Sequence, residues 1–123
     1  MNLINPLPDS PLDSRLQHSP KRLSNQVILV TGATGGIGLR TAAHLIKQGA
    51  SVYLVGRHPQ KTQQVSTQLG AAGFFLADLS ELSEVQRLGS EIRQRLDHLD
   101  ALVNNAGGIF SKRAETREGI EMT

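Results

Sequence analysis

Four glycines gather directly after an apolar run in this 123-residue chain, and they suggest phosphate chemistry. Residues 27–30 are aliphatic, and residues 31–38 read Thr-Gly-Ala-Thr-Gly-Gly-Ile-Gly. A strand that turns through glycines into a helix leaves backbone N–H groups free at the helix N-terminus, where the helix dipole is positive. The pattern therefore predicts a turn that holds a pyrophosphate.

The spacing separates this turn from two other phosphate-binding loops. A Walker loop needs Lys and then Ser or Thr after its last glycine, whereas Leu39 and Arg40 follow Gly38. The usual dinucleotide fingerprint needs a glycine at position 41, which is Thr41 here. An ordinary glycine-rich turn is the alternative for an isolated cluster, but the position between a strand pattern and a helix pattern favours a ligand.

The composition argues against several other kinds of site. The chain has no cysteine, which excludes disulfides, thiolate metal sites and a cysteine nucleophile. No two of the four histidines have the spacing of metal ligands. The net charge is only +2, basic residues are scattered and aromatic residues are few, so we expect no nucleic-acid interface. No apolar run reaches the ~20 residues that span a membrane, and we expect a cytoplasmic protein. The sequence predicts no oligomeric state.

Two parts of the chain differ in composition. Four of the five prolines lie within residues 1–20, and we expect residues 1–24 to form a disordered leader. Residues 25–123 alternate between strand and helix patterns. Strands are expected at 27–30, 51–56, 73–77 and 100–103, and helices at 36–47, at 59–69 and from Ser80, as a capping residue, through Leu99.

This alternation predicts an α/β fold, a Rossmann-type doubly wound parallel sheet of about four strands with flanking helices. Right-handed crossovers give the strand order 3-2-1-4, which is one half of the complete fold. Pro59 is expected to begin the second helix, while Gly49, in the left-handed conformation, and Gly70 are expected to end the first and second helices.

In such a sheet, ligands bind beyond the carboxyl ends of the strands, where the strand order reverses. Four informative segments are predicted to reach this edge. The glycine turn follows the first strand and Arg57 follows the second. Asp78 and Leu79 follow the third strand, and residues 104–107, Asn-Asn-Ala-Gly, follow the fourth. The occurrence of all four segments at strand ends is stronger evidence for a nucleotide site than any one of these motifs alone.

Together these segments resemble the short-chain dehydrogenase/reductase family over residues 25–110, with similarity to retinol-dehydrogenase-like members at 54–57 and 118–122. The resemblance implies an NAD(P)-binding domain over residues 25–123, and hydride transfer between a nicotinamide cofactor and a carbonyl or alcohol substrate. It implies that the glycine turn wraps the pyrophosphate, that Asp78 and Leu79 contact adenine, and that residues 105–107 line the ribose. The implied cofactor-binding residues are Gly32, Thr34, Gly35, Gly36, Ile37, Gly38, Arg57, Asp78, Leu79, Asn105, Ala106 and Gly107.

Simpler roles are open for some of these residues. Asp78 also suits an acid at the start of the next helix, beside Ser80. Asn104 is expected to tie the fourth strand to its neighbours, and both Asn104 and Asn105 also suit a loop whose amides satisfy local backbone groups.

Arg57 indicates which nicotinamide cofactor is used. An NAD site usually presents an acid about 20 residues after the glycine turn, whereas a cation there accommodates the 2′-phosphate of NADP. A guanidinium also pairs bidentately with phosphate and stacks on adenine. The sequence therefore favours NADP over NAD, with Lys61 as a further source of positive charge. The alternative is a solvated arginine at a strand end.

No catalytic residue is expected in this chain. The family uses a Tyr, a Lys four residues later, a Ser and an Asn, but the only tyrosine is Tyr53, inside an expected strand and followed at the fourth position by Arg57. Residues 118–123 resemble the start of the family's next helix, so the domain is expected to be incomplete at its C-terminus, with the catalytic half missing. The alternatives are a non-catalytic module that binds or senses NADP(H) and a non-functional gene remnant. The substrate is not predicted.

Overall fold

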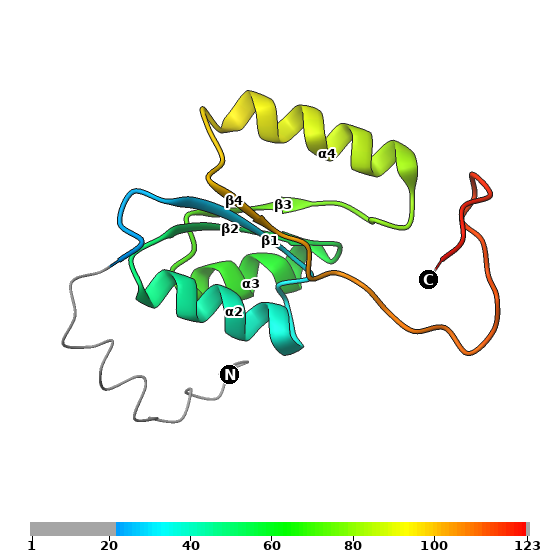
Figure 1. The fold of residues 1–123 in the computed structure, drawn as a ribbon, viewed down its shortest axis with the longest axis horizontal. Helices are drawn as coiled ribbons and strands as arrows, with labels where there is room; N and C mark the ends of the chain where they lie inside the picture. Colours follow the sequence, from blue (N-terminus) through cyan, green and yellow to red (C-terminus); the bar gives the residue numbers. More distant parts are fainter. Residues whose placement is uncertain (1–21, 123) are drawn as a thin grey trace.

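The computed structural model describes residues 22–122 and contains one parallel sheet with helices on both of its faces (Figure 1). The described elements in chain order are β1 (Val27–Thr31), α2 (Gly36–Lys47), β2 (Ser51–Gly56), α3 (Pro59–Leu69), β3 (Gly73–Leu76), α4 (Leu82–Arg95) and β4 (Ala101–Val103). The sheet order is β3-β2-β1-β4, and every pairing is parallel. The predicted Rossmann-type order is therefore confirmed.

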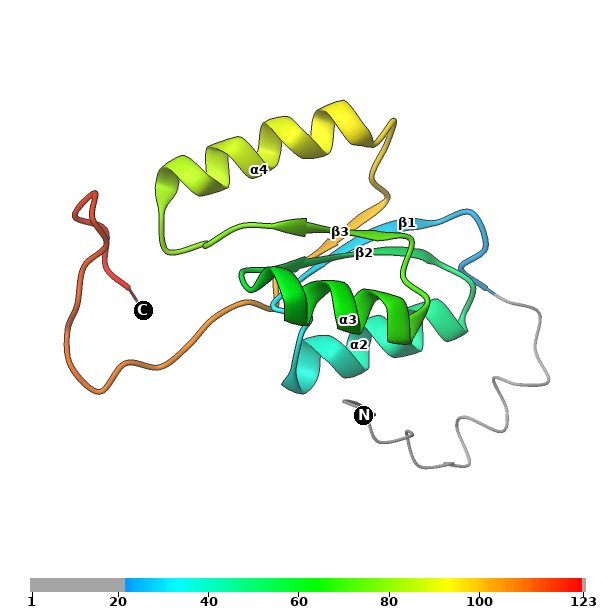
Figure 2. The ribbon, with the colours of Figure 1, turned by 180° about the vertical axis from the view of Figure 1, so that it is seen from behind.

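The continuous apolar runs of the central strands follow from burial on both faces. Successive side chains of a strand point to opposite faces, so both faces of β1 and β2 must meet helices. Val30 and Leu54 are fully buried in the core beneath α2 and α3. Leu29, Val55 and Phe75 pack in a second core on the face that α4 covers (Figure 2).

Local signals set most helix ends as predicted. Pro59 begins α3, and Gly70 ends it in the left-handed conformation with φ of 70°. After α2 ends, Gly49 has a φ of 98°, which glycine adopts without strain. Gly49 and Gly70 thus let the chain turn from α2 into β2 and from α3 into β3.

The predicted bounds of α4 were wrong at both ends. Glu81, not Ser80, precedes the helix, because the Ser80 hydroxyl donates to the Asp78 carboxylate at 2.6 Å. The helix ends at Arg95 rather than Leu99. Leu96 is already extended, with φ of −116°, and the chain then returns to the sheet, where the Asp100 N–H donates to the Val27 carbonyl at 2.8 Å.

The segment expected to begin another helix forms a turn. Glu115 and Glu121 make an isolated antiparallel bridge, and between them Gly119 has a φ of 81°. The Thr116 hydroxyl accepts a hydrogen bond from the Ile120 N–H at 3.1 Å. Such side-chain bonds compete with helix formation, so the helix start expected over residues 118–123 is not present in the described residues 118–122.

The described residues begin within the span assigned to the leader. Residues 1–21 lie outside the described part of the chain, and Arg22–Asn25 form a turn in which Leu23 packs against the core. Among residues 22–122 no helix has the length and apolar character needed to cross a bilayer.

Candidate functional site

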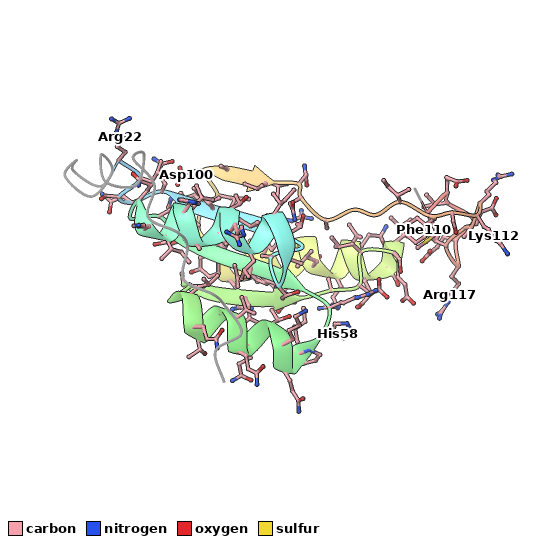
Figure 3. The ribbon with its side chains drawn as sticks, turned by 90° about the horizontal axis from the view of Figure 1, so that it is seen from below. Arg22, His58, Asp100, Phe110, Lys112 and Arg117 are labelled. Carbon is pink, nitrogen blue, oxygen red and sulfur yellow. The ribbon has the colours of Figure 1, made fainter. Side chains whose placement is uncertain are left out.

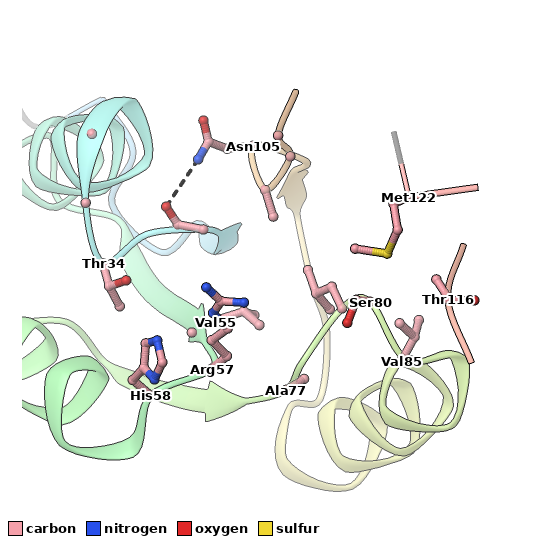
Figure 4. A pocket seen from close by; sticks show the side chains of 18 of the residues that line it. Thr34, Val55, Arg57, His58, Ala77, Ser80, Val85, Asn105, Thr116 and Met122 are labelled. Atoms are coloured by element: carbon pink, nitrogen blue, oxygen red, sulfur yellow. Dashed lines mark hydrogen bonds between the residues drawn. The ribbon is translucent and has the colours of Figure 1, made fainter. Parts of the chain in front are cut away.

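A pocket with a volume of about 1070 Å³ lies at the carboxyl ends of the strands. It is lined from the ends of β1, β2, β3 and β4, from the first turns of α4, and from the segment that follows β4 (Figure 4). This is the upper end of the size range of small-molecule sites, roughly 300–1,000 Å³. Of the predicted site residues, the structure places Gly32, Thr34, Gly35, Gly36, Ile37, Arg57, Leu79, Asn105, Ala106 and Gly107 in its lining. Gly38 and Asp78 lie outside that lining.

The glycine turn presents an uncapped helix end to this pocket. α2 has no side-chain cap and no acidic residue in its first turn. Its first N–H groups therefore lack helical partners and face a site where the dipole favours an anion. A Cβ placed on Gly35 or Gly36 would meet no atom within 4 Å, so there is open space for a ligand directly against this backbone.

Gly38 has a different role from Gly35 and Gly36. A Cβ at Gly38 would overlap the Gly32 carbonyl oxygen and lie 2.5 Å from the amide nitrogen of Asn105. Gly38 thus allows α2 to pack closely against the turn and β4, although it does not face the pocket. The close approach at Gly38 is thus between segments of the protein.

Asn105 and Thr31 join the end of β4 to the glycine turn. The N–H groups of Asn105 and Ala106 donate to Thr31 Oγ1 at 3.1 and 3.0 Å. The Asn105 side chain donates to the carbonyls of Thr31 and Gly32 at 3.1 and 3.2 Å, and Figure 4 marks one hydrogen bond of this side chain with a dashed line. The tie that the sequence assigned to Asn104 is therefore made by Asn105, while Asn104 is exposed. The acceptors of the Asn105 amide are backbone carbonyls of the glycine turn, 73 and 74 positions away, and not groups of its own loop as in the simpler alternative.

Positive charge gathers where β2 passes into α3. Arg57, His58 and Lys61 are exposed and line the pocket, and Figure 4 shows Arg57 and His58 beside its opening. α3 has no acidic residue in its first turn. The sequence identified Arg57 and Lys61 but missed His58, whose position next to Arg57 was the available signal. The arrangement suits a phosphate monoester.

Asp78 is engaged with the start of the next helix. Its carboxylate accepts hydrogen bonds from the Ser80 hydroxyl at 2.6 Å and from the Ser80 N–H at 3.0 Å. These two bonds, with a smaller contribution from the charge of Arg57, lower the pKa of Asp78 below its ordinary value. Leu79, the next residue, lines the pocket.

The wall opposite the glycine turn was not predicted. It combines Leu82 and Val85 of α4 with Thr116, Ile120 and Met122 from the segment after β4. This segment leaves the sheet and comes back toward the start of α4, as Figures 1 and 2 show. No local pattern signalled this return.

Neither a metal site nor the family's catalytic pair is present in the described residues. No group of three or more His, Cys, Asp or Glu side chains within residues 22–122 could hold a metal ion. Tyr53 is half-buried in β2, and its ring packs against Phe75 with centroids 5.9 Å apart. It is a core residue rather than part of the pocket lining.

Comparisons with known proteins agree with this architecture. A family model described as short chain dehydrogenase matches residues 26–122. The chain is 40% identical over 106 residues to a proposed daunorubicin C-13 ketoreductase, DnrU, from Streptomyces sp. (strain C5), and the match covers 82% of this chain and 37% of that protein. It is 39% identical over 104 residues to a 3β-hydroxysteroid dehydrogenase from Mediterraneibacter gnavus, covering 81% of this chain and 37% of that protein.

A solved structure adds a bound ligand to the comparison. A short chain dehydrogenase from Escherichia coli CFT073, in complex with NADPH, matches with a TM-score of 0.68 and 32% identity, over 73% of this chain and 40% of that one. The chain thus spans 37% of the length of each of the two curated relatives above.

Proposed function

Because the chain belongs to the short chain dehydrogenase family, we propose that its pocket binds NADP(H) and that it is the cofactor-binding portion of an oxidoreductase. The nicotinamide supplies hydride transfer to or from a carbonyl or alcohol substrate. The observation that carries this proposal is the pocket itself, in which an uncapped helix end and a cationic turn face one space at the carboxyl ends of the strands.

The proposed assignment divides the pocket along the cofactor. The turn at residues 34–37 holds the diphosphate through backbone N–H groups and the Thr34 hydroxyl. Residues 105–107 line the adjoining ribose, and Leu79 lies against adenine. Ser80 already donates two hydrogen bonds to the Asp78 carboxylate. Asp78 therefore accepts a hydrogen bond from the adenine amino group through the carboxylate lone pairs that remain.

The preference for NADP over NAD rests on the β2–α3 turn. Arg57 pairs with the 2′-phosphate. His58 adds a donor from the same turn, and Lys61 adds one from the first turn of α3. The related structure complexed with NADPH supports this choice. The chain offers no Tyr with a Lys four positions later, and we propose that hydride transfer depends on residues supplied elsewhere in the complete enzyme.

Titration of the purified 123-residue chain with NADPH and with NADH tests the cofactor preference. We expect saturable binding of one NADPH per chain, with NADH at least about tenfold weaker, since a charged pair contributes about 1.5–3 kcal/mol. Arg57→Glu should remove the preference. Arg22→Glu, the same charge change at the opposite end of the sheet, is the matched control (Figure 3). A folded chain that binds neither cofactor refutes the proposal and leaves a remnant without this activity.

Gly35→Ala tests the diphosphate assignment separately from folding. Gly35 has an extended φ of −167°, and an added Cβ would meet no protein atom within 4 Å. The free energy of unfolding should therefore change by less than about 0.5 kcal/mol. A diphosphate held against this backbone would meet the new methyl group, so NADPH affinity should fall by at least about tenfold. Unchanged affinity would place the diphosphate elsewhere.

A further inference from the structure

Gly56, the last residue of β2, is the point where the glycine turn and α3 meet. A Cβ at Gly56 would overlap the Thr62 hydroxyl oxygen and lie 2.9 Å from the methyl carbon of Thr34. Gly56 is buried and has no left-handed φ, so the requirement for glycine is one of space. The side chains of Thr34 in the glycine turn and Thr62 in α3 thus both pack against the backbone of Gly56, directly before Arg57.

Thr62 makes a buried polar contact that the proposed cofactor contacts do not use. Its side chain is completely buried on α3. The Thr62 hydroxyl donates to the His58 carbonyl at 2.7 Å, and the Thr62 N–H donates to the same oxygen at 2.9 Å. A buried hydroxyl needs such a partner, and both bonds hold the backbone of the residue that follows Arg57.

We propose that Thr62 is a positioning residue that fixes the turn at residues 57 and 58, and through it the direction in which Arg57 meets a phosphate monoester. This inference rests on the proposed binding of NADP(H). The Arg57 side chain is exposed and long, so ordering it on a phosphate costs conformational entropy. A backbone already held by Thr62 reduces that cost, because fewer torsions remain to be fixed. Thr62 itself lies outside the pocket lining.

Thr62→Val removes the hydroxyl while keeping the shape of the buried side chain, and Thr62→Ser keeps the hydroxyl. We expect Thr62→Val to raise the Kd for NADPH about fivefold, as the loss of one hydrogen bond predicts, and to leave the Kd for NADH within about twofold. Thr62→Ser should retain the NADPH preference. A purely structural role would weaken both cofactors equally or lower only the melting temperature, and either result overturns the proposal.

A double-mutant cycle with Arg57→Gln tests whether Thr62 acts through Arg57. In the Arg57→Gln background, Thr62→Val should change the Kd for NADPH by less than about twofold. The same fivefold loss without Arg57 would overturn the inference. Thr62→Ala replaces Thr62→Val in the cycle if the valine variant does not fold.

The two proposals fail in different ways. A wild-type chain that binds no cofactor removes the proposed function and this inference with it. A wild-type chain that prefers NADPH, together with a Thr62→Val variant that keeps the same preference, removes the inference alone.

Discussion

The two walls of the pocket are held by different kinds of interaction. The glycine-turn wall consists of residues 32–37 and 105–107, with Thr31 and Gly38 packed behind them, and the α4 wall consists of residues 79–85 with the segment 113–122, which contacts the start of α4. In the first, neutral hydrogen bonds converge on Thr31, which is 8% exposed, and a helix packs on the turn through Gly38. In the second, the main contacts are ion pairs and carboxylate bonds on the surface.

The α4 wall is assembled from exposed charges. Arg113 pairs with both Glu115 and Glu121 at 3.0 Å, and its side chain is 78% exposed. Arg117, 82% exposed, lies 3.6 Å from Glu81. The Glu118 carboxylate accepts from the Leu82 N–H at 3.1 Å, at the start of a helix that has no side-chain cap of its own. Figure 3 shows Lys112 and Arg117 extending into solvent at this end of the molecule.

This difference predicts how each wall responds to change. Close packing and neutral hydrogen bonds change little with salt concentration or pH, but an added methyl group disrupts them. Exposed ion pairs contribute little individually, so single substitutions there are mild, while pH acts on them directly. The proposed diphosphate site therefore lies on the wall with a fixed shape, and the proposed adenine site borders the adaptable wall.

Gly38→Ala should cause the largest loss, because the new methyl group would overlap a backbone carbonyl that has little room to move. We expect the free energy of unfolding to fall by about 3 kcal/mol, the upper range for overpacking. Urea denaturation measures it. Gly89→Ala on α4 is the matched control: the nearest atom is 3.9 Å from the added Cβ, and the helix should gain about 0.5–1 kcal/mol. Equal stability of the two variants would contradict the proposed rigidity of the glycine-turn wall.

The glycine-turn wall was largely predictable from the sequence because its signals are local. Residues 27–30 and 52–55 are largely apolar since both faces of the central strands are buried, and the glycine turn follows the first of these strands directly. The strand order follows from crossover handedness. The partner of the Thr31 hydroxyl was not predictable, because the bond joins residues 74 positions apart.

The α4 wall was missed because its contacts are long-range and its local patterns mislead. The apolar period of α4 continues through Leu96 and Leu99, yet the helix ends earlier to let β4 pair with β1. Glu118 contacts the start of α4 across 36 positions, and nothing in the spacing indicates that contact. The sequence places Asp78 beside Ser80 at the start of the helix. It does not show that the Asp78 carboxylate accepts hydrogen bonds from both the N–H and the hydroxyl of Ser80, because that depends on side-chain rotamers.

Thr31→Val should have the next largest effect and tests the neutral hydrogen bonds of the same wall. Valine keeps the shape of threonine but removes the acceptor of the Ala106 N–H and one of the two acceptors of the Asn105 N–H, which also donates to the Val103 carbonyl at 3.0 Å. We expect the free energy of unfolding to fall by about 1 kcal/mol, the net contribution of a typical hydrogen bond, because these bonds are only partly buried. Thr31→Ser, which keeps the oxygen, should lose less. If valine and serine variants unfold at the same urea concentration, the hydroxyl does not join β4 to the turn.

Glu118→Gln should have the smallest effect, confined to the α4 wall. The Glu118 N–H, the Thr116 hydroxyl and the N–H groups of Leu82 and Ser83 lower the pKa of Glu118 below its ordinary 4.5. A carboxyl with a lowered pKa stabilises the folded arrangement above its ordinary pKa, and this contribution is lost as the pH falls through the lowered value. Residues 113–122 should therefore be protected from hydrogen exchange at pH 7 and released in acid.

The measurement is the hydrogen-exchange protection of a peptide covering residues 113–122, followed from about pH 7 to about pH 3, a range that includes the titration of carboxyl groups. It distinguishes the effect of the Glu118 charge from general unfolding in acid. Glutamine keeps an oxygen acceptor but cannot gain a proton, so Glu118→Gln should show weaker protection at pH 7 and a smaller change with pH in this peptide. Glu91→Gln removes a charge from the middle of α4, where Glu91 pairs with Arg87 and Arg95, and should leave the release of residues 113–122 unchanged. If both variants shift that release equally, the charge of the whole helix holds the segment, and the α4 wall would depend on summed electrostatics rather than on one carboxylate at the helix start.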